Sequence, residues 1–228
     1  MKKSRSKTSV STARRNPGRP KDKTNLRESI LDVAELAFAE TGFAGTTTRV
    51  IAARADVNQN LIRYYFKNKK ALYDEVIRRR GALLAGRRHV LLDRLIADGR
   101  DYSLEEVIRA YVQPQWEIKQ SGPSGAAFIR LQARLHAEPD EHSLNLRHEV
   151  YDAAVQRYIN AVVPLLPGIA RETISVRWAF LVGTYLFMLN DLGRIEDISE
   201  GSVTELESDE MLDNMVTFLA AGFRAAMP

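Results

Sequence analysis

Residues 46–72 read TTTRVIAARADVNQNLIRYYFKNKKAL, and this stretch decides what kind of domain the N-terminal part of the chain forms. Thr47 and Asn58 are residue types whose side chains cap the first turn of a helix. We therefore predict two short helices, 47–55 and 58–66, separated by a short turn. Two helices of this length joined in this way have the dimensions of a helix-turn-helix unit.

The two short helices divide their residues into an inner and an outer set. The apolar residues available for a shared core are Ile51, Ala52, Ala55, Val57 and Ile62. The polar residues left for the outer surface are Thr47, Arg49, Asn58, Gln59, Asn60, Arg63 and Tyr64. Amide side chains bind adenine and arginine binds guanine through paired hydrogen bonds, whereas hydroxyls and lysines bind phosphates. The outer set therefore predicts a surface that reads double-stranded DNA, although such helix pairs also occur in proteins that never bind DNA.

Charge is distributed unevenly along the chain. Residues 1–24 contain nine Lys and Arg against one acidic residue, and residues 81–228 contain 14 against 21, within a formal net charge of +4. Segment 1–24 has almost no large apolar side chains, so we predict a disordered basic arm. Arg19 in this arm could enter a minor groove, as arginines of flexible arms do. A solvated tail that only aids solubility is the alternative.

Beyond the arm, apolar residues recur with the period of a helix, and the alternation typical of strands is not sustained. The sequence predicts an all-α fold with nine helices, at about 26–42, 47–55, 58–66, 69–97, 103–120, 122–138, 141–166, 171–192 and 205–227. We divide the chain into the arm (1–24), a helix-turn-helix DNA-binding domain (25–68) and a second helical domain (69–228).

The last two predicted helices carry more apolar surface than the rest of the chain readily covers. Helix 171–192 is apolar nearly all round between Trp178 and Leu189, and helix 205–227 has apolar residues on two faces. Either both helices are central in one subunit, or one face of each packs on a second copy. We favour a two-fold homodimer through these helices, because a symmetric interface of this kind is a common solution.

Other classes of protein are disfavoured by features that the sequence lacks. It has no Cys, which fits a reducing compartment. The longest apolar run, 179–189, is too short to span a bilayer, and the basic N-terminus lacks the apolar segment of a signal peptide. We therefore expect a cytoplasmic protein with no membrane partner. Nucleotide-binding, metalloprotease and serine-hydrolase motifs are absent, so we expect no catalytic site, no cofactor and no metal.

The N-terminal residues resemble a known family. Thr46-Thr47-x-Arg49-x-Ile51-Ala52-x-x-Ala55-x-Val57, then Leu61-Ile62-Arg63-Tyr64-Tyr65-Phe66-Lys67-Asn68-Lys69-x-Ala71-Leu72, is similar to the N-terminal pattern of TetR-family transcriptional regulators. The resemblance covers about residues 26–80, and only the number and order of helices match beyond them. It implies a homodimer of nine-helix subunits with a C-terminal ligand-binding and dimerisation domain. Such proteins are usually repressors that leave a palindromic operator when a small molecule binds.

The resemblance also implies roles for individual residues. Phosphate contacts would come from Thr47, Tyr64 or Tyr65, Lys67 and Lys69, and base contacts from Arg49, Gln59, Asn60 and Arg63. The chain departs from the family pattern at three positions, where Val50 replaces an acidic residue, Asp56 replaces Gly and Arg63 replaces Tyr or a similar residue. Asp tolerates a left-handed turn, so we expect the fold to survive. Arg63 adds charge and could alter base preference.

A ligand pocket is expected between the helices of the C-terminal domain, mostly apolar with a few polar groups. The aromatic candidates for its lining are Trp116, Phe128, Tyr151, Tyr158, Trp178 and Tyr185, and the polar candidates are Arg134, His148 and Asn190. Ordinary core packing is the alternative for each of them, because aromatic residues at helical spacing usually lie in a core. The sequence does not identify the ligand.

These patterns lead to one main hypothesis, a homodimeric repressor that binds a palindromic DNA operator and is released by a small-molecule effector. One alternative is a regulator that needs no ligand, or an activator. The other is a helical small-molecule-binding or catalytic protein whose basic arm binds polyanions without specificity.

Overall fold

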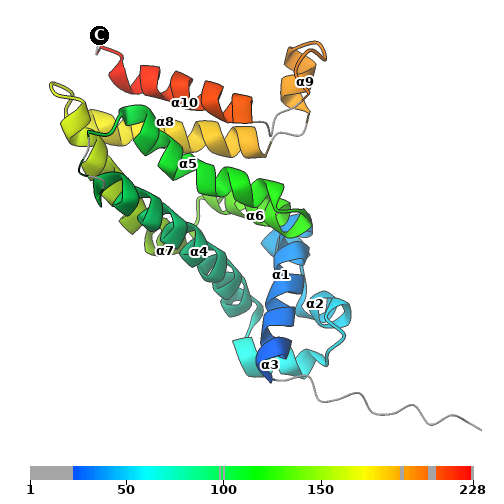
Figure 1. The fold of residues 1–228 in the computed structure, drawn as a ribbon. Coiled ribbons are helices and arrows are strands. Elements are labelled where there is room, and N and C mark those ends of the chain that lie inside the picture. The colour runs from blue at the N-terminus through cyan, green and yellow to red at the C-terminus, as the bar shows by residue number, and fades with distance from the viewer. Residues whose placement is uncertain (1–22, 98, 100, 191–192, 205–208, 227–228) are drawn as a thin grey trace, which may run out of the picture.

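A computed structural model describes residues 23–97, 99, 101–190, 193–204 and 209–226, and within these residues the chain forms helices and their connections without a β-strand (Figure 1). The all-α prediction is confirmed for this part of the chain. The predicted arm, including Arg19, lies outside the described residues except for Lys23 and Thr24, which begin the first helix.

The described residues contain ten α-helices and one short 3₁₀ helix. They are α1 (Lys23–Gly45), α2 (Thr48–Arg54), α3 (Gln59–Phe66), α4 (Lys69–Ala97), α5 (Leu104–Gln120), α6 (Pro123–Ala137), α7 (Glu141–Val162), η1 (Val163–Leu165), α8 (Arg171–Leu189), α9 (Arg194–Ile198) and α10 (Asp209–Arg224). All nine predicted helices are present, with ends shifted by a few residues. The count of nine is corrected by α9, because a helix of five residues is too short to show a hydrophobic period.

Side-chain caps fix where the two short helices begin. The Thr47 hydroxyl accepts a hydrogen bond from Val50 N–H at 3.2 Å, and the Asn58 side-chain oxygen accepts one from Asn60 N–H at 2.9 Å. Between the helices, Asp56 has a φ of 52°, the left-handed conformation that the turn requires. Asp adopts this conformation more readily than most residues, and the chain keeps the helix-turn-helix geometry without a glycine there.

The helices place the two ends of the molecule far apart. Figure 1 shows α2 and α3 at the lower end and α8 beside α10 at the upper end, with α4 running between these regions. Helix α1 packs against α2 and also against α4 and α6, so it joins the helix-turn-helix unit to the larger part of the chain. Helix α3 is also connected to the larger part directly, because it contacts α4, which begins at Lys69.

Two glycines allow helices to approach closely. A Cβ atom at Gly81 of α4 would lie 2.0 Å from Val150 Cγ1 of α7, and one at Gly125 would lie 1.8 Å from the Ile118 carbonyl oxygen. Neither position has room for a larger residue without movement of a neighbour. Gly86, also on α4, has no such neighbour within 4 Å. Helix α4 therefore carries one glycine in close contact with a neighbouring helix, Gly81, and one without such a contact, Gly86.

Candidate functional site

Helix α3 and its surroundings present a polar surface. The residues of the helix-turn-helix unit that were predicted to contact DNA are exposed at Thr47, Arg49, Asn58, Gln59, Asn60, Arg63, Tyr64 and Lys67. Gln59, Asn60, Arg63 and Lys67 also line one hollow in this surface. Beneath it, the side chains of the unit's predicted core, together with Phe66, are largely buried. The structure thus brings the predicted amide and basic side chains together over a rigid base.

Thr48 is a member of this surface that the sequence did not reveal. Its hydroxyl accepts a hydrogen bond of 2.9 Å from Gln59 Nε2, which ties the beginning of α3 to the beginning of α2. Because its amide is held in this way, the Gln59 side chain has fewer orientations to lose on binding a partner than a free side chain would have. The only sequence signal for Thr48 was its place in a run of three threonines, whose members have different environments.

The two tyrosines of α3 have separate roles. Tyr64 is 73% exposed, whereas Tyr65 is half-buried and packs edge-to-face against the Tyr64 ring at a centroid distance of 5.2 Å. Phe66 points into the core, with the Arg27 guanidinium 5.3 Å from its ring centroid. Of the two tyrosines, Tyr64 is therefore the one that can reach a DNA backbone, and Tyr65 supports its ring.

Lys69 is engaged within the protein. Its Nζ donates hydrogen bonds to the carbonyl oxygens of Phe43 at 2.8 Å and Thr46 at 3.0 Å, and it lies 4.3 Å from the Phe43 ring centroid. These contacts hold the connection between α1 and α2 against the start of α4. The structure gives the ammonium group of Lys69 a scaffolding role, and Lys67 is the more exposed lysine of the pair. Lys69 lines the same hollow as Lys67, and its phosphate contact stays a prediction.

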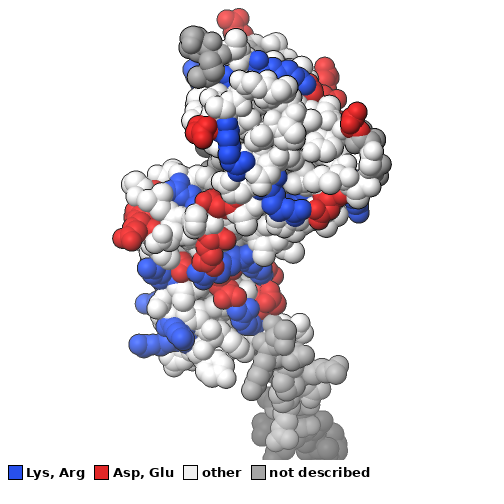
Figure 2. All heavy atoms as spheres, turned by 90° about the vertical axis from the view of Figure 1, so that its left-hand side faces the viewer, with Lys and Arg blue, Asp and Glu red and all other residues white. Residues whose placement is uncertain are grey.

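The electrostatics of this end suit a polyanion. Residues 46–72 contain six Lys and Arg and one acidic residue, Asp56. Figure 2 shows Lys and Arg intermixed with Asp and Glu over the middle of the molecule, and basic side chains without acidic neighbours at the lower end of that face. Opposite charges in the middle neutralise one another, so the positive potential is concentrated near the helix-turn-helix unit.

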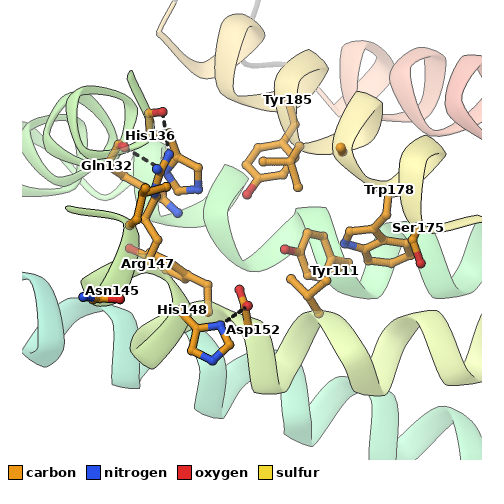
Figure 3. Close-up of a pocket in the computed structure, with 15 residues that line it drawn as sticks. Tyr111, Gln132, His136, Asn145, Arg147, His148, Asp152, Ser175, Trp178 and Tyr185 are labelled. Atoms are coloured by element: carbon orange, nitrogen blue, oxygen red, sulfur yellow. Dashed lines mark hydrogen bonds and ion pairs between the residues drawn. The ribbon is translucent and has the colours of Figure 1, made fainter. Parts of the chain in front are cut away.

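A cavity of about 710 Å³ lies among α5, α6, α7 and α8, far from the helix-turn-helix unit (Figure 3). Four of the predicted ligand-binding residues line it: His148, Tyr151, Trp178 and Tyr185. The lining also includes residues that were not predicted, namely Tyr111, Gln132, His136, Leu144, Asn145, Arg147, Asp152, Val155, Ser175, Ala179 and Val182. Among these, Tyr111 offered an aromatic signal that the prediction overlooked, whereas the polar residues do not differ in type from ordinary surface residues.

The other predicted ligand-binding residues lie elsewhere. Trp116, Phe128 and Tyr158 are buried in the core and do not line this cavity. The Tyr158 hydroxyl lies 2.8 Å from Arg88 O and 3.0 Å from Ala110 O, so it connects α7 to α4 and α5. Arg134 lines a second hollow of about 400 Å³ beside α1, and Asn190 caps the end of α8. Helical spacing shows that a side chain is inward but not which void it faces, so the sequence could not assign these residues to this cavity.

Burial alters the ionisable groups around the cavity. It raises the pKa of Tyr151 and of Tyr185 well above the ordinary tyrosine value, so both hydroxyls remain protonated. Burial also lowers the pKa of His136, and the charges of Arg147 and Arg88 lower it further, although a hydrogen bond to Gln132 O opposes this. His136 is therefore neutral at pH 7, and its Nδ1–H donates to Gln132 O at 3.0 Å.

Two sequence models of one family match most of the chain. "Bacterial regulatory proteins, tetR family" matches residues 30–76, and "Tetracyclin repressor-like, C-terminal domain" matches residues 109–222, half of the chain. The chain belongs to the TetR family. Its membership confirms the resemblance seen in residues 46–72. Within the described residues, no helix is long and apolar enough to cross a membrane, and no group of three or more His, Asp or Glu could hold a metal ion.

Curated relatives of this TetR-family chain match only in part. The probable HTH-type transcriptional regulator YttP of Bacillus subtilis (strain 168) is 40% identical over 55 residues, which cover 24% of this chain and 27% of YttP. The biofilm operon negative regulator IcaR of Staphylococcus aureus (strain Newman) is 22% identical over 127 residues, 56% of this chain and 62% of IcaR. The matches thus span less than two thirds of these relatives.

Solved structures show the same fold over most of the chain. The transcriptional regulator FadR from Bacillus subtilis, in complex with stearoyl-CoA, aligns with a TM-score of 0.63 at 15% identity, covering 86% of this chain and 98% of FadR. The complex of SmeT with triclosan aligns with a TM-score of 0.60 at 20% identity, covering 86% of this chain and 90% of SmeT. At these identities the alignments establish the TetR-family fold alone.

Proposed function

We propose that the protein is a homodimeric transcriptional repressor that binds a palindromic DNA operator and leaves it when a small molecule occupies the cavity. The observation that carries this proposal is the exposed polar face of α3, with Asn58, Gln59, Asn60 and Arg63 on a capped helix in a basic surrounding. A recognition helix enters the major groove with its N-terminal residues first, which is where the amides lie. Arg19 and the rest of the basic arm would add minor-groove contacts.

The homodimer is supported by uncovered apolar side chains at the other end of the molecule. On α8, Val176, Phe180 and Phe187 are 54%, 65% and 55% exposed, and on α10 Phe218 is 68% exposed. The three α8 residues recur at helical spacing, and Gly183 between them leaves room for close approach of a partner. A second copy that packs α8 and α10 on the same helices would bury this patch around a two-fold axis.

The cavity supports the effector part of the proposal. Its volume of about 710 Å³ is within the range of small-molecule sites, and its wall combines aromatic rings with a few polar groups. IcaR is named a negative transcriptional regulator, SmeT is described as the repressor of a multidrug efflux pump, and FadR was solved with stearoyl-CoA. These descriptions favour repression and effector release in this chain too, and we place its action in the cytoplasm, where its DNA would be.

A gel-shift titration against the DNA upstream of the protein's own gene tests the proposal. We expect a sequence-specific complex that unlabelled random DNA does not displace at equal concentration, and whose affinity falls as salt rises. Footprinting should show an inverted repeat whose half-sites are about 34 Å apart or somewhat more, because two recognition helices in a dimer meet successive major grooves.

One outcome of the same titration would contradict the proposal. If the complex formed equally well on random DNA of the same length, the polar face of α3 would not be reading sequence and the proposal would be wrong. A reporter gene under that upstream DNA then distinguishes repression from activation. Deletion of the protein should raise reporter output if it is a repressor and lower it if it is an activator.

A further inference from the structure

Three buried polar atoms lack a hydrogen-bond partner in the described part of the chain, and all three belong to residues that line the cavity. They are Gln132 Nε2, Tyr151 OH and Trp178 Nε1. Buried polar groups are nearly always paired in folded proteins, so such a concentration in one place needs an explanation. Two of these atoms can only donate a hydrogen bond, and the third is a hydroxyl that can donate. The residues around the cavity therefore carry three donor groups without an acceptor.

The charge of Arg88 determines which end of the Gln132 amide, oxygen or nitrogen, is left without a partner. The guanidinium of Arg88, which is 1% exposed, donates through Nη2 to Gln115 Oε1 at 3.1 Å, and Gln115 Nε2 in turn donates to Gln132 Oε1. Because arginine has no acceptor, the Gln115 amide must turn its oxygen towards Arg88, and this fixes the Gln132 amide as well. The Gln132 NH₂ group is thus the end of this series of hydrogen bonds that has no partner.

The charges around the cavity leave a positive excess. Arg88 makes its described hydrogen bonds to Tyr111 O, Gln115 Oε1 and Tyr185 OH, and none of these partners is a carboxylate. Arg147 in the lining donates to the carbonyl oxygens of His136 and Glu138.

The lining contains one acidic residue, Asp152, and its Oδ2 lies 2.6 Å from His148 Nδ1 (Figure 3). The lining thus contains one carboxylate and one arginine, Arg147, while the buried Arg88 lies behind Gln115 and Gln132. A buried charge without a counter-ion favours an anion nearby.

The remaining wall is aromatic. Figure 3 shows the Tyr111 and Tyr185 hydroxyls and the Trp178 ring nitrogen turned towards the side on which Gln132, His136 and His148 lie. The Tyr111 and Trp178 rings meet edge-to-face at 4.8 Å, so they form a rigid apolar surface beside the donors.

We infer that the effector of the proposed repressor is an aromatic or similarly flat carboxylate. Its carboxylate would meet the Gln132, Tyr151 and Trp178 donors, and its apolar body would lie against the aromatic wall.

Three probes of one shape test this inference: biphenyl-4-carboxylate, the neutral 4-acetylbiphenyl and the cationic 4-phenylbenzylamine, titrated into the full chain by isothermal calorimetry. We expect the carboxylate to bind at least about tenfold more tightly than the ketone, since hydrogen bonds to a charged acceptor are stronger than those to a neutral one, and the amine to bind most weakly. Equal affinities, or tighter binding of the ketone or amine than of the carboxylate, would overturn the inference.

The variant Gln132→Glu replaces the unpaired NH₂ donor of Gln132 with a carboxylate oxygen, which is an acceptor. Its carboxylate still accepts from Gln115, so the buried network is kept, but an oxygen replaces the free NH₂ group and compensates Arg88. We expect the order of the probes to invert, with the amine above the carboxylate. Gln156→Glu is the matched control, because Gln156 is exposed, accepts from Arg171 at 3.0 Å and does not line the cavity. An unchanged order in Gln132→Glu would contradict the inference.

The variant Trp178→Phe removes the indole donor and keeps an aromatic ring. We expect it to weaken the carboxylate about 10- to 100-fold while the ketone changes less. A gel shift of wild-type protein with upstream DNA, run without any probe, keeps this test separate from the proposed function. Specific DNA binding together with no preference for the carboxylate would reject the effector class alone, whereas a preference without DNA binding would reject the repressor alone.

Discussion

Arg80 of α4 forms a two-pronged ion pair with Glu35 of α1, with Nε 2.6 Å from Oε2 and Nη2 2.8 Å from Oε1. Glu35 is fully buried, and the Ser124 hydroxyl of α6 also donates to it at 3.0 Å. Arg79 reaches the same carboxylate at 3.4 Å. Helices α1, α4 and α6 therefore meet at one carboxylate, at the junction between the helix-turn-helix unit and the larger domain.

Glu35→Gln should destabilise this junction. The change leaves two arginines near a neutral amide in a buried site, and breaking a buried pair in this way costs about 3–5 kcal/mol of unfolding free energy. Urea denaturation measures it. Asp32→Asn is the matched control, because Asp32 also pairs with Arg79 but its side chain is 66% exposed, and we expect a loss below about 1 kcal/mol. Equal losses in the two variants would show that burial of Glu35 is not what matters.

Gly81→Ala and Gly86→Ala should have opposite effects, although both replace a glycine of α4. The first would force Val150 to move and lose about 1–3 kcal/mol of stability through overpacking. The second meets open space, and alanine's better helix propensity should add about 0.5–1 kcal/mol. Thermal unfolding of the two variants beside the wild type checks the pair, and a stabilised Gly81→Ala protein would refute the close contact.

The sequence was most informative where local rules operate. Helical periodicity and the caps at Thr47 and Asn58 predicted nine of the helices and the turn at Asp56, because these depend on residues a few positions apart. It was less informative about Lys69 and Trp116, whose surroundings depend on helices distant in the chain. A lysine at a predicted DNA surface cannot be distinguished by sequence from one that binds two carbonyl oxygens. The cavity's donors at Gln132 and Trp178 were likewise fixed by tertiary packing.

Arg63 and Lys67 should differ in what they contribute to DNA binding. Arg63→Ala should lose about 1–3 kcal/mol of discrimination at one base pair, because an arginine at a base edge reads sequence. Lys67→Gln should weaken specific and random DNA alike and reduce the salt dependence by about one phosphate contact. Gel-shift titrations on specific and random DNA at several salt concentrations provide both quantities. The same loss on both DNAs for Arg63→Ala would remove it from the base-reading set.

Phe180→Glu should convert the proposed dimer into a monomer. A charge placed in the apolar patch of α8 would lose its water on association without gaining a counter-charge, which disfavours the interface. Sedimentation equilibrium measures the mass. Leu83→Glu is the control, since Leu83 is 57% exposed on α4 and lies outside the patch, so that variant should remain dimeric. A dimeric Phe180→Glu protein would place the interface elsewhere.

His136 should make the protein sensitive to mild acid. Because burial lowers its pKa in the folded state, the unfolded chain binds a proton more readily, and its contribution to stability is present above pH about 6.5 and declines as the pH falls below that value. His136→Gln should reduce the loss of unfolding free energy between pH 7 and pH 5. In the same urea series, a His136→Gln variant that loses as much unfolding free energy as the wild type between pH 7 and pH 5 would contradict the assignment.

The unpaired hydroxyl of Tyr151 should be disfavoured by selection for stability and favoured by selection for the response to an effector. A buried polar group without a partner costs about 1–3 kcal/mol, so the empty protein should become more stable when this hydroxyl is removed. A population selected only for heat resistance, with no effector present, should therefore accumulate Tyr151→Phe. A population selected for the ability to respond should retain Tyr151, and the frequency of this one hydroxyl would then record which demand had acted on the lineage.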